Sequence, residues 1–368
     1  MNHRYLLTGF FLLSACSESG EMVTSRQPTA ADMLASDNVS GYLRADKARQ
    51  FSFPEDHGPH PGFRNEWWYL TGNLESEEGE RFGYQVTFFS SQLRPQNDCA
   101  DNSAWCTDRV WMGHAAISEV TGKQHHKAEI FSRENPGLAG ASQSPFRVWI
   151  QDWQLFSATD SFPWELEIIE EDFAISLLLT PQKRPVLQGE SGLSQKSSEP
   201  GNASYYYSMT RLDAAGQVHV DGKQHVIDGT SWLDREWSTS ALGKDQSGWD
   251  WFSLQFNDGS ELMYYQLRDL EGNAHPYSSG NLTTLIGGQI PVSRNEITLQ
   301  ETASWQAPDG TVYTTGWRMG YQDKSWLINA VFDEQLMDVT FQYWEGAVDI
   351  MEESTGSIIG HGYLEMVR

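Results

Sequence analysis

Three short blocks of the sequence place carboxyl groups beside large aromatic side chains. The blocks are residues 66–68 (EWW), 231–238 (SWLDREWS) and 343–346 (YWEG). A carboxyl group beside an indole ring loses hydration, which raises its pKa and can make it a proton donor at neutral pH. The same pattern is typical of structural ion pairs, with Arg64 or Arg81 as the partner of the first acid, so both interpretations stay open. The candidate acids are Glu66, Asp234, Glu236 and Glu345.

If residues 231–238 form a strand, their side chains alternate between its two faces. Asp234 and Glu236 then point one way, while Arg235 and Trp237 point the other. The block therefore predicts either an acid–base site or a buried ion-pair network. Aromatic rings in and near the three blocks are candidates for ligand binding: Trp67, Trp68, Trp237, Trp249, Trp251, Tyr343 and Trp344.

Two histidines in the segment DHGPH at residues 56–60, His57 and His60, are further candidates for acid–base chemistry. With Asp56 and Glu66 they could also be metal ligands. Between them, Gly58-Pro59 makes a stiff turn in which the two imidazoles need not converge, which favours a hydrogen-bonded loop clamp. We therefore predict neither a metal nor another cofactor.

Several known machineries have no support in the sequence. It contains no G-x-S-x-G, H-E-x-x-H, P-loop, G-x-G-x-x-G or EF-hand motif, which argues against serine-hydrolase, zincin and nucleotide chemistry. The net charge of −25, from 50 acidic and 25 basic residues, argues against binding nucleic acid, because phosphates need clustered lysine and arginine. The same charge disfavours broad docking onto an anionic membrane.

The elements that must position the candidate residues are predicted to be β-strands. Side chains alternate with a period of two, most clearly over residues 81–93, and residues 249–256 and 261–268 form the clearest hairpin. Residues 181–202 are the least structured internal stretch, either a loop over a barrel mouth or part of a domain junction. With 15 Trp, 14 Tyr and 17 Phe, the pattern predicts antiparallel β-structure in two units, at residues 46–225 and 226–368.

The N-terminus is typical of an exported lipoprotein. Residues 1–15 combine a basic start with a short apolar core, and Leu13-Ser14-Ala15-Cys16 resembles a bacterial lipobox. We predict lipidation of Cys16 and a flexible tether over residues 16–45. By resemblance to Gram-negative lipoproteins, Ser17 favours the periplasmic face of the outer membrane. An ordinary signal peptide with an incidental cysteine is the alternative.

Cys99 and Cys106 remain as an even pair once Cys16 carries lipid. Export brings them into an oxidising compartment, so we predict a disulfide that closes the loop CADNSAWC, with two reduced thiols as the alternative.

Six ordered blocks resemble the AttH-like and carotenoid 1,2-hydratase family of lipocalin-like proteins. They are DHGPH (56–60), EWWYLTGNL (66–74), FGYQVTFF (82–89), SWLDREWS (231–238), GWDWFSLQF (248–256) and YWEGAV (343–348). The resemblance covers roughly residues 50–366 and implies an all-β fold of two lipocalin-like (calycin-type) antiparallel β-barrels packed together. It also implies similarity to cofactor-independent hydratases that add water to an isoprenoid double bond. The hydratase branch has histidines where this chain has residues 234–236, so only Trp237 carries over.

Three hypotheses about function follow from the sequence. The first is a lipid-anchored periplasmic protein that binds a hydrophobic small molecule, lipid or isoprenoid in a lipocalin-like barrel. The second is a hydratase that protonates an alkene with one of the candidate acids and stabilises the cation with aromatic faces. The third is an accessory partner of an envelope transport complex. A buried carboxyl group inside a ligand cavity would favour the second hypothesis.

Overall fold

The computed structural model describes residues 39–95, 105–240 and 242–368. Within these ranges the regular secondary structure is almost all β-strand, and the helical segments are two short 3-10 turns, η1 (Glu55–His57) and η2 (Arg294–Glu296). None of the helices in the described ranges has the length and apolar character needed to cross a bilayer. Cys16, Cys99 and residues 1–15 lie outside the described residues, so lipidation and the disulfide with Cys106 stay predictions.

The strands of the first half are β1 (Asn65–Ser76), β2 (Arg81–Gln92), β3 (Arg109–Glu119), β4 (Gln124–Arg133), β5 (Ala139–Gln143), β6 (Phe146–Ile150), β7 (Trp153–Phe156), β8 (Trp164–Ile169), β9 (Phe173–Pro181), β10 (Val186–Leu187), β11 (Leu193–Gln195), β12 (Ala203–Val220) and β13 (Lys223–Ser240). Those of the second half are β14 (Gln246–Phe256), β15 (Glu261–Asp269), β16 (Ser279–Thr283), β17 (Gln289–Ser293), β18 (Ile297–Gln306), β19 (Val312–Tyr321), β20 (Lys324–Ala330), β21 (Leu336–Met337), β22 (Tyr343–Glu352) and β23 (Ile358–Val367).

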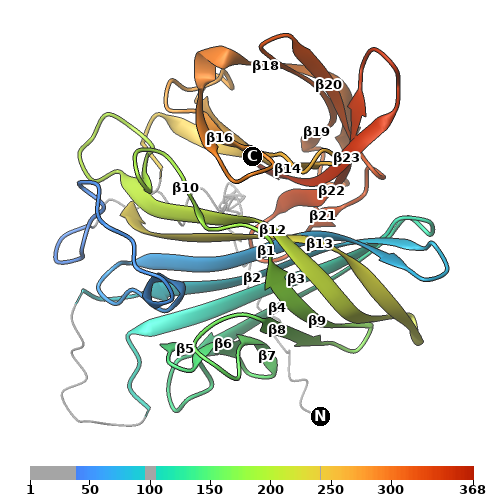
Figure 1. Ribbon diagram of the computed structural model, residues 1–368. Coiled ribbons are helices and arrows are strands. Elements are labelled where there is room, and N and C mark those ends of the chain that lie inside the picture. Colours follow the sequence, from blue (N-terminus) through green and yellow to red (C-terminus); the bar gives the residue numbers. More distant parts are fainter. Residues whose placement is uncertain (1–38, 96–104, 241) are drawn as a thin grey trace, which may run out of the picture.

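These strands form two antiparallel sheets that lie against each other (Figure 1). The first sheet has the order β4-β3-β2-β1-β13-β12-β9-β8-β7-β6-β5, with β10 and β11 paired to β12. The second has the order β17-β16-β15-β14-β23-β22-β20-β19-β18, with β21 paired to β22. One sheet curls into a nearly closed barrel, in the upper part of Figure 1, and the other into a half-barrel. The predicted fold class is confirmed.

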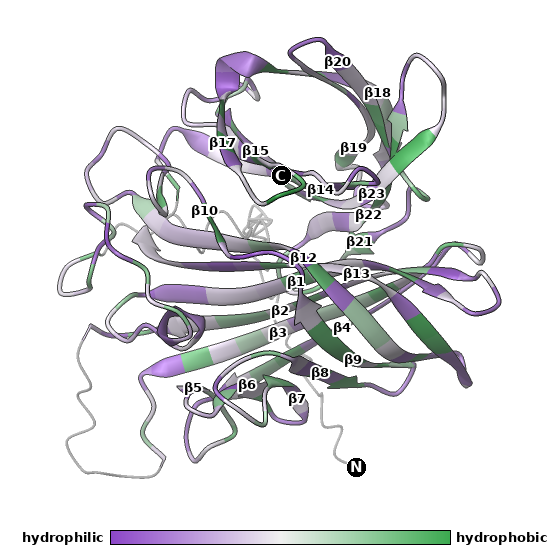
Figure 2. Cartoon of the chain, viewed as in Figure 1, coloured by the Kyte–Doolittle hydropathy of each residue, from purple (hydrophilic) through white to green (hydrophobic). Residues whose placement is uncertain are grey.

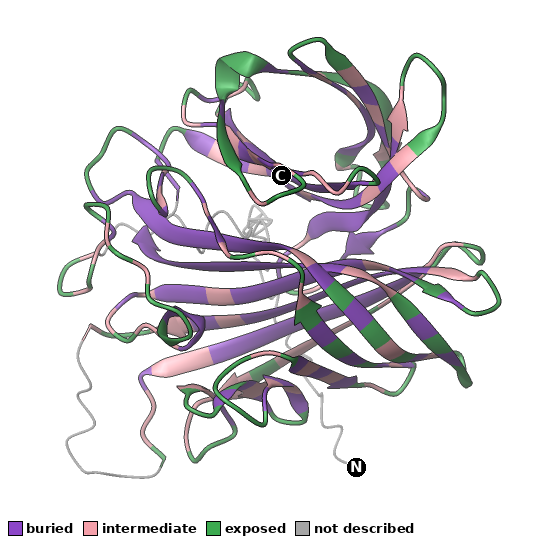
Figure 3. Ribbon diagram, in the orientation of Figure 1, coloured by how far each residue is buried: buried purple, intermediate pink, exposed green. Residues whose placement is uncertain are grey.

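Each sheet buries side chains on both faces where the two sheets meet. One cluster of buried apolar side chains fills the concave face of the first sheet, a second fills that of the second sheet, and a third lies between the sheets. Strand β9 alternates between buried and accessible residues, as expected with one face in water. Strand β14 is almost continuously buried, because its second face packs against the other sheet. Figures 2 and 3 show this contrast in hydropathy and burial.

The longest element is a hairpin of β12 and β13, which have 18 residues each. Its turn is Asp221-Gly222, and both residues have positive φ, 50° and 79°. Asp-Gly is favoured in such two-residue turns because glycine and aspartate tolerate positive φ. The division predicted after residue 225 falls inside β13, and the first sheet continues to Ser240. The segment 181–202, expected to be the least structured internal stretch, contributes the short strands β10 and β11 to the first sheet.

Candidate functional site

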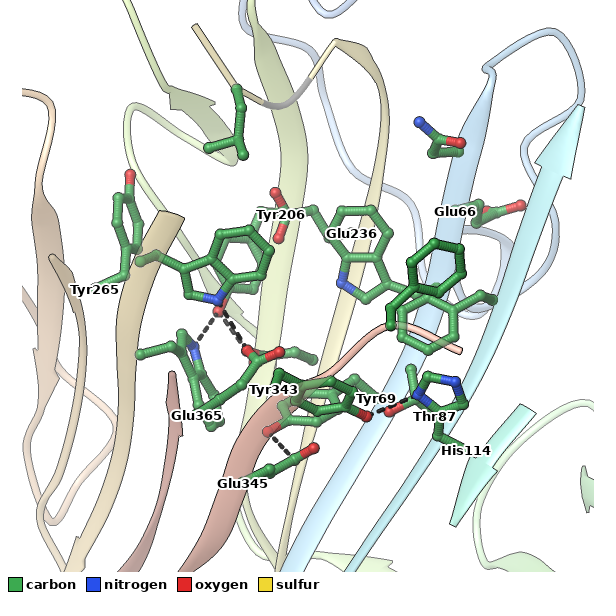
Figure 4. Close-up of a pocket in the computed structure, with 18 of the residues that line it drawn as sticks. Glu66, Tyr69, Thr87, His114, Tyr206, Glu236, Tyr265, Tyr343, Glu345 and Glu365 are labelled. Atoms are coloured by element: carbon green, nitrogen blue, oxygen red, sulfur yellow. Dashed lines mark hydrogen bonds between the residues drawn. The ribbon is translucent and has the colours of Figure 1, made fainter. Parts of the chain in front are cut away.

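A cavity of about 140 Å³ lies between the outer faces of the two sheets (Figure 4). It is walled by β1, β2, β3, β12 and β13 of the first sheet and by β14, β15, β22 and β23 of the second. Its aromatic lining includes Trp67, Tyr69, Phe89, Tyr206, Trp249, Trp251, Tyr265, Phe341 and Tyr343. Its ionisable lining is Glu66, His114, Lys196, Asp234, Glu236, Glu345 and Glu365. The walls of the cavity are therefore mostly aromatic, but several carboxyl groups face into it.

Strand alternation decides which residues reach this cavity. On β22, Tyr343 and Glu345 face it, whereas Trp344 between them packs in the core of the second sheet. On β13, Asp234 and Glu236 face it, and Arg235 points to the opposite side. Residues 234–237 therefore alternate between the two faces of β13, as the sequence predicted. Of the predicted aromatic ligands, Trp67, Trp249, Trp251 and Tyr343 line the cavity, while Trp68, Trp237 and Trp344 are core residues.

Glu345 is a fully buried carboxyl group held by a tyrosine. The Tyr69 hydroxyl donates to Glu345 Oε1 at 2.5 Å, across the interface between the two sheets. The second oxygen, Oε2, has no hydrogen-bond partner among the described residues. Burial, followed by the charge of Glu365, raises the pKa of Glu345 well above its usual value. Burial therefore favours the protonated form of Glu345, and its Oε2 is left without a hydrogen bond in the described part of the chain.

Asp234 is held by three donors from the first sheet. Ser208 Oγ and Trp232 Nε1 donate to Oδ1 at 2.5 and 2.7 Å, and the Tyr206 hydroxyl donates to Oδ2. Burial raises the pKa of Asp234 to about 7, although all three hydrogen bonds favour the ionised form. Because both oxygens already accept hydrogen bonds, Asp234 is fixed in position.

Glu365, which the sequence analysis missed, completes the set of weak acids. Trp249 Nε1 donates to its Oε2 at 3.0 Å. Burial raises the pKa of Glu365 to about 7, opposed by this hydrogen bond and supported by the charges of Asp234 and Glu236. Protein surrounds the Glu365 side chain, and the part that remains accessible faces the cavity. Glu365 can therefore exchange a proton with a molecule in the cavity near neutral pH.

Glu236 forms the charged end of the cavity with Lys196. Lys196 Nζ lies 3.4 Å from Glu236 Oε1 and 4.1 Å from the centre of the Tyr265 ring. Burial opposes the charge of Lys196, but Glu236 and Tyr265 outweigh burial and raise its pKa. Lys196 follows β11, in the segment whose role the sequence left open. The two side chains therefore form an ion pair at this end of the cavity.

The raised pKa values make the fold sensitive to pH, and Glu365→Gln tests this. A carboxyl group whose pKa is raised on folding stabilises the fold below its unfolded pKa, and this contribution is lost as the pH rises through the folded value. For Glu365 that window runs from 4.5 to about 7. Glutamine keeps an acceptor for Trp249 but carries no charge. We therefore expect the free energy of unfolding of Glu365→Gln, relative to that of the wild type, to rise by about 1–3 kcal/mol between pH 5 and pH 8. Urea unfolding at both pH values measures the difference.

The matched control for this experiment is Glu353→Gln. Glu353 is partly exposed, and hydrogen bonds from Ser325 and Arg318 lower its pKa, so it is ionised at both pH values. We expect no change in its stability difference from wild type between pH 5 and pH 8. If the stability difference from wild type changed equally with pH in both variants, the raised pKa of Glu365 would not be the cause of the pH dependence.

Glu66, the acid of the most conspicuous sequence block, is not a proton donor. Arg235 Nη2 lies 2.7 Å from Glu66 Oε1, and His60 Nδ1 lies 2.7 Å from the same oxygen. Burial raises the pKa of Glu66, but Arg235 and His60 outweigh it and lower the value to about 2. The contacts of Glu66 favour the structural interpretation of this block over the catalytic one. The partner is Arg235, and neither Arg64 nor Arg81 was the right choice.

His57 and His60 belong to the same network behind the cavity wall. The main-chain carbonyl of His57 accepts from Trp68 Nε1 at 3.0 Å, and its Nδ1 contacts the Tyr207 hydroxyl at 2.6 Å. His60 bridges two carboxyl groups, with Asp56 at its Nε2, and stacks on Trp237 with ring centres 3.6 Å apart. Both histidines clamp the loop to the first sheet, and neither lines the cavity.

Within the described ranges, one group has ligand atoms close enough for a metal ion: Glu78, Glu80 and His225, whose atoms lie within 4.8 Å of one another. Lys223 Nζ lies 3.0 Å from Glu80 Oε2, and His225 Nδ1 lies 2.8 Å from the same oxygen. The lysine already neutralises Glu80, so this group is a surface ion-pair cluster. It does not include His57 or His60.

Several residues of the cavity escaped the sequence analysis. Glu365 stands on β23 between two core residues, and Tyr69, Tyr206 and His114 occupy the same alternation on β1, β12 and β3. Their common signal is an ionisable or phenolic side chain inside a strand that is buried on both faces. That signal appears only after the two sheets are known to pack back to back.

Comparisons with known proteins agree with the architecture. A family model described as AttH-like matches residues 44–367. The structure named as an AttH protein from Nitrosomonas europaea is 30% identical, covers 88% of this chain and 99% of its own, and has a TM-score of 0.80. Kievitone hydratase from Nectria haematococca is 12% identical, covers 89% and 95%, and has a TM-score of 0.68. CghA with Sch210972 is 12% identical, covers 92% and 97%, and has a TM-score of 0.53. The last two share the fold alone. The curated proteins include no match.

Proposed function

This chain belongs to the AttH-like family, as the sequence resemblance indicated, and from that premise we propose that it is a cofactor-independent hydratase. The proposed site is the cavity between the two sheets. One observation supports it above all: three weak acids, Asp234, Glu345 and Glu365, converge on one aromatic cavity. A carrier of apolar ligands needs the aromatic walls but gains nothing from carboxyl groups that are costly to bury.

The proposed reaction adds water to a carbon–carbon double bond. The neutral Glu345 carboxyl group gives its proton to one alkene carbon, and the π electrons form the new C–H bond. The positive charge that develops on the other carbon is stabilised by aromatic faces such as those of Trp249 and Trp251. Water then bonds to this carbon, and its extra proton passes to ionised Glu365. The reverse sequence dehydrates an alcohol with the same groups.

The size of the cavity limits the class of substrate that it can hold. A cavity of about 140 Å³ is smaller than the roughly 300–1,000 Å³ typical of drug-sized ligands. It suits the reactive end of an unsaturated lipid or isoprenoid, or a small alkene. The kinship in fold with kievitone hydratase supports water addition as the reaction class, although that protein's own substrate is not carried over.

A labelled-water experiment tests the proposal. The purified full-length protein is incubated in ¹⁸O water with a panel of unsaturated isoprenoids and fatty acids, and products are analysed by mass spectrometry. We expect an alcohol that carries one labelled oxygen, and none with heat-denatured protein. If lipids co-purify with the protein but no panel member gains labelled oxygen, the protein is a carrier and the hydratase proposal is wrong. The best panel substrate then serves for all kinetic comparisons.

A further inference from the structure

A chain of polar side chains runs inward from the protein surface toward Glu345. It begins at Glu129 on β4, passes through His114 on β3, and reaches Tyr343 on β22, next to Glu345. His114 Nε2 lies 3.0 Å from Glu129 Oε1, and His114 Nδ1 lies 2.8 Å from the Tyr343 hydroxyl. Figure 4 shows the hydrogen bond between His114 and Tyr343, and beside it Glu345 with its hydrogen bond from Tyr69. We propose that Glu129, His114 and Tyr343 conduct protons between solvent and Glu345.

Strand register places each member of this chain. His114 and Glu129 are directly opposite partners in the antiparallel pairing of β3 and β4, so their side chains share one face. Tyr343 and Glu345 are two residues apart on β22, which puts them on one face of that strand. The ring of Tyr343 stacks on His114 with centres 5.6 Å apart. Two sheets therefore contribute two adjacent members each.

The outer end is open to water and the inner end is sealed from it. The Glu129 side chain is 16% exposed and accepts a hydrogen bond from the exposed Thr340 hydroxyl at 2.7 Å. His114 is only 1% exposed, and Glu345 is equally buried. Both ring nitrogens of His114 are engaged, so the imidazole connects Glu129 with Tyr343.

Proton positions are consistent along the whole chain. With Glu129 ionised, His114 carries its single proton on Nε2 and donates to Glu129, while Nδ1 accepts from the Tyr343 hydroxyl. Tyr343 then offers only its oxygen toward the protonated Glu345. When Glu345 has lost its proton, His114 first changes tautomer, so that Nδ1 carries its proton, and the Tyr343 hydroxyl turns from Nδ1 toward Glu345. Glu129 protonated by water passes a proton to Nε2, the Nδ1 proton moves to the Tyr343 oxygen, and the Tyr343 proton moves to Glu345.

Each proton moves by one place in this transfer, and the chain ends in its starting polarity. In turnover, Glu345 loses a proton to carbon while the proton of water goes to Glu365. The path reloads Glu345 from solvent, and Glu365 releases its proton to solvent through the cavity. This role in turnover rests on the proposed hydration. The proton path itself can be tested without any substrate.

The test follows hydrogen–deuterium exchange of the Glu345 carboxylic acid by infrared spectroscopy after transfer of the full-length protein into D₂O. The C=O band of a protonated acid that is present in the wild-type protein and lost in Glu345→Gln reports Glu345, which is 1% exposed and hydrogen-bonded to Tyr69. We expect His114→Phe, which keeps an aromatic ring against Tyr343, to keep the band but slow its exchange at least about ten-fold.

Two further variants make the result decisive. Glu129→Gln acts at the partly exposed end, where folding is least at risk, and we expect it to slow the exchange as well. His361→Gln is the matched control, because His361 also contacts a carboxylate, Asp349, at 2.8 Å but lies off the path. Exchange at the wild-type rate in Glu129→Gln would overturn the path from the surface. Exchange at the wild-type rate in His114→Phe would overturn it entirely, whatever the labelled-water experiment finds.

Discussion

Replacing Glu345 by glutamine is expected to reduce the hydration rate by about 10²–10⁴-fold, because the variant has no proton to give to the alkene. Glutamine has nearly the same shape, and its carbonyl oxygen can accept the hydrogen bond that Tyr69 now donates at 2.5 Å. Burial favours the neutral form of the Glu345 carboxyl group, which a neutral amide resembles in charge. The fold should therefore stay intact while the reaction stops.

The measurement is kcat and KM on the best substrate of the labelled-water panel. We expect kcat to fall and KM to change little, because the apolar walls that bind the alkene are untouched. Glu353→Gln on the surface is the matched control and should keep the wild-type rate. If Glu345→Gln kept its activity while Glu365→Gln lost it, the roles of the two acids would have to be exchanged.

Replacing Arg235 by methionine is expected to cost about 3–5 kcal/mol of unfolding free energy, the range measured when one partner of a buried ion pair is removed. Arg235 is fully buried, and its guanidinium stacks 3.8 Å from the centre of the Trp68 ring. It also donates to the carbonyl oxygens of Gly58 and Trp67 at 2.6 and 2.9 Å. Its loss leaves the Glu66 carboxylate buried and without its main countercharge.

Acid should reduce this penalty. Wild-type Glu66 has its pKa lowered to about 2, so the pair stabilises the fold above the unfolded value of 4.5, and this contribution is lost as the pH falls toward 2. Without Arg235 the pKa of Glu66 rises, and the carboxylate becomes protonated in mild acid. We therefore expect the difference between wild type and Arg235→Met to be smaller at pH 4 than at pH 7 in urea unfolding.

Two controls isolate the ion pair. The double variant Glu66→Gln with Arg235→Met removes both charges and should recover part of the lost stability. Arg318→Met breaks an accessible pair with Glu353 and should cost no more than about 1 kcal/mol. A loss in Arg235→Met that does not change with pH would point to lost packing on Trp68 as its cause.

The sequence predicted the strands well where alternation was the only constraint. It also predicted the two faces of residues 234–237, because alternation follows from backbone geometry alone. It misjudged Glu66, because the partner of that carboxylate, Arg235, is 169 residues away and meets it only through the pairing of β1 with β13. Glu365 and His114 were missed for a related reason: their importance depends on which sheet faces which, and no local pattern encodes that.

The three blocks of aromatic and acidic residues indicated the family and the fold, but they were a poorer guide to which residues form the site. Trp68, Trp237 and Trp344 drew attention as large rings beside acids, yet each lies one residue out of phase with the cavity. Their neighbours Trp67, Glu236, Tyr343 and Glu345 have the correct phase. A single-residue step along a strand thus separates a core residue from a cavity residue.

The position of the cavity, between the backs of two separately packed cores, has a consequence for how this family can diversify. A pocket inside a barrel must be hollowed out of the core that holds the barrel together, so changes of specificity compete with stability. Here the wall residues belong to the third cluster, between the sheets, so their exchange repacks that cluster and leaves the cores of the two sheets in place. Substitutions in the interface cluster, remote from any reacting group, are therefore a direct route to new substrates.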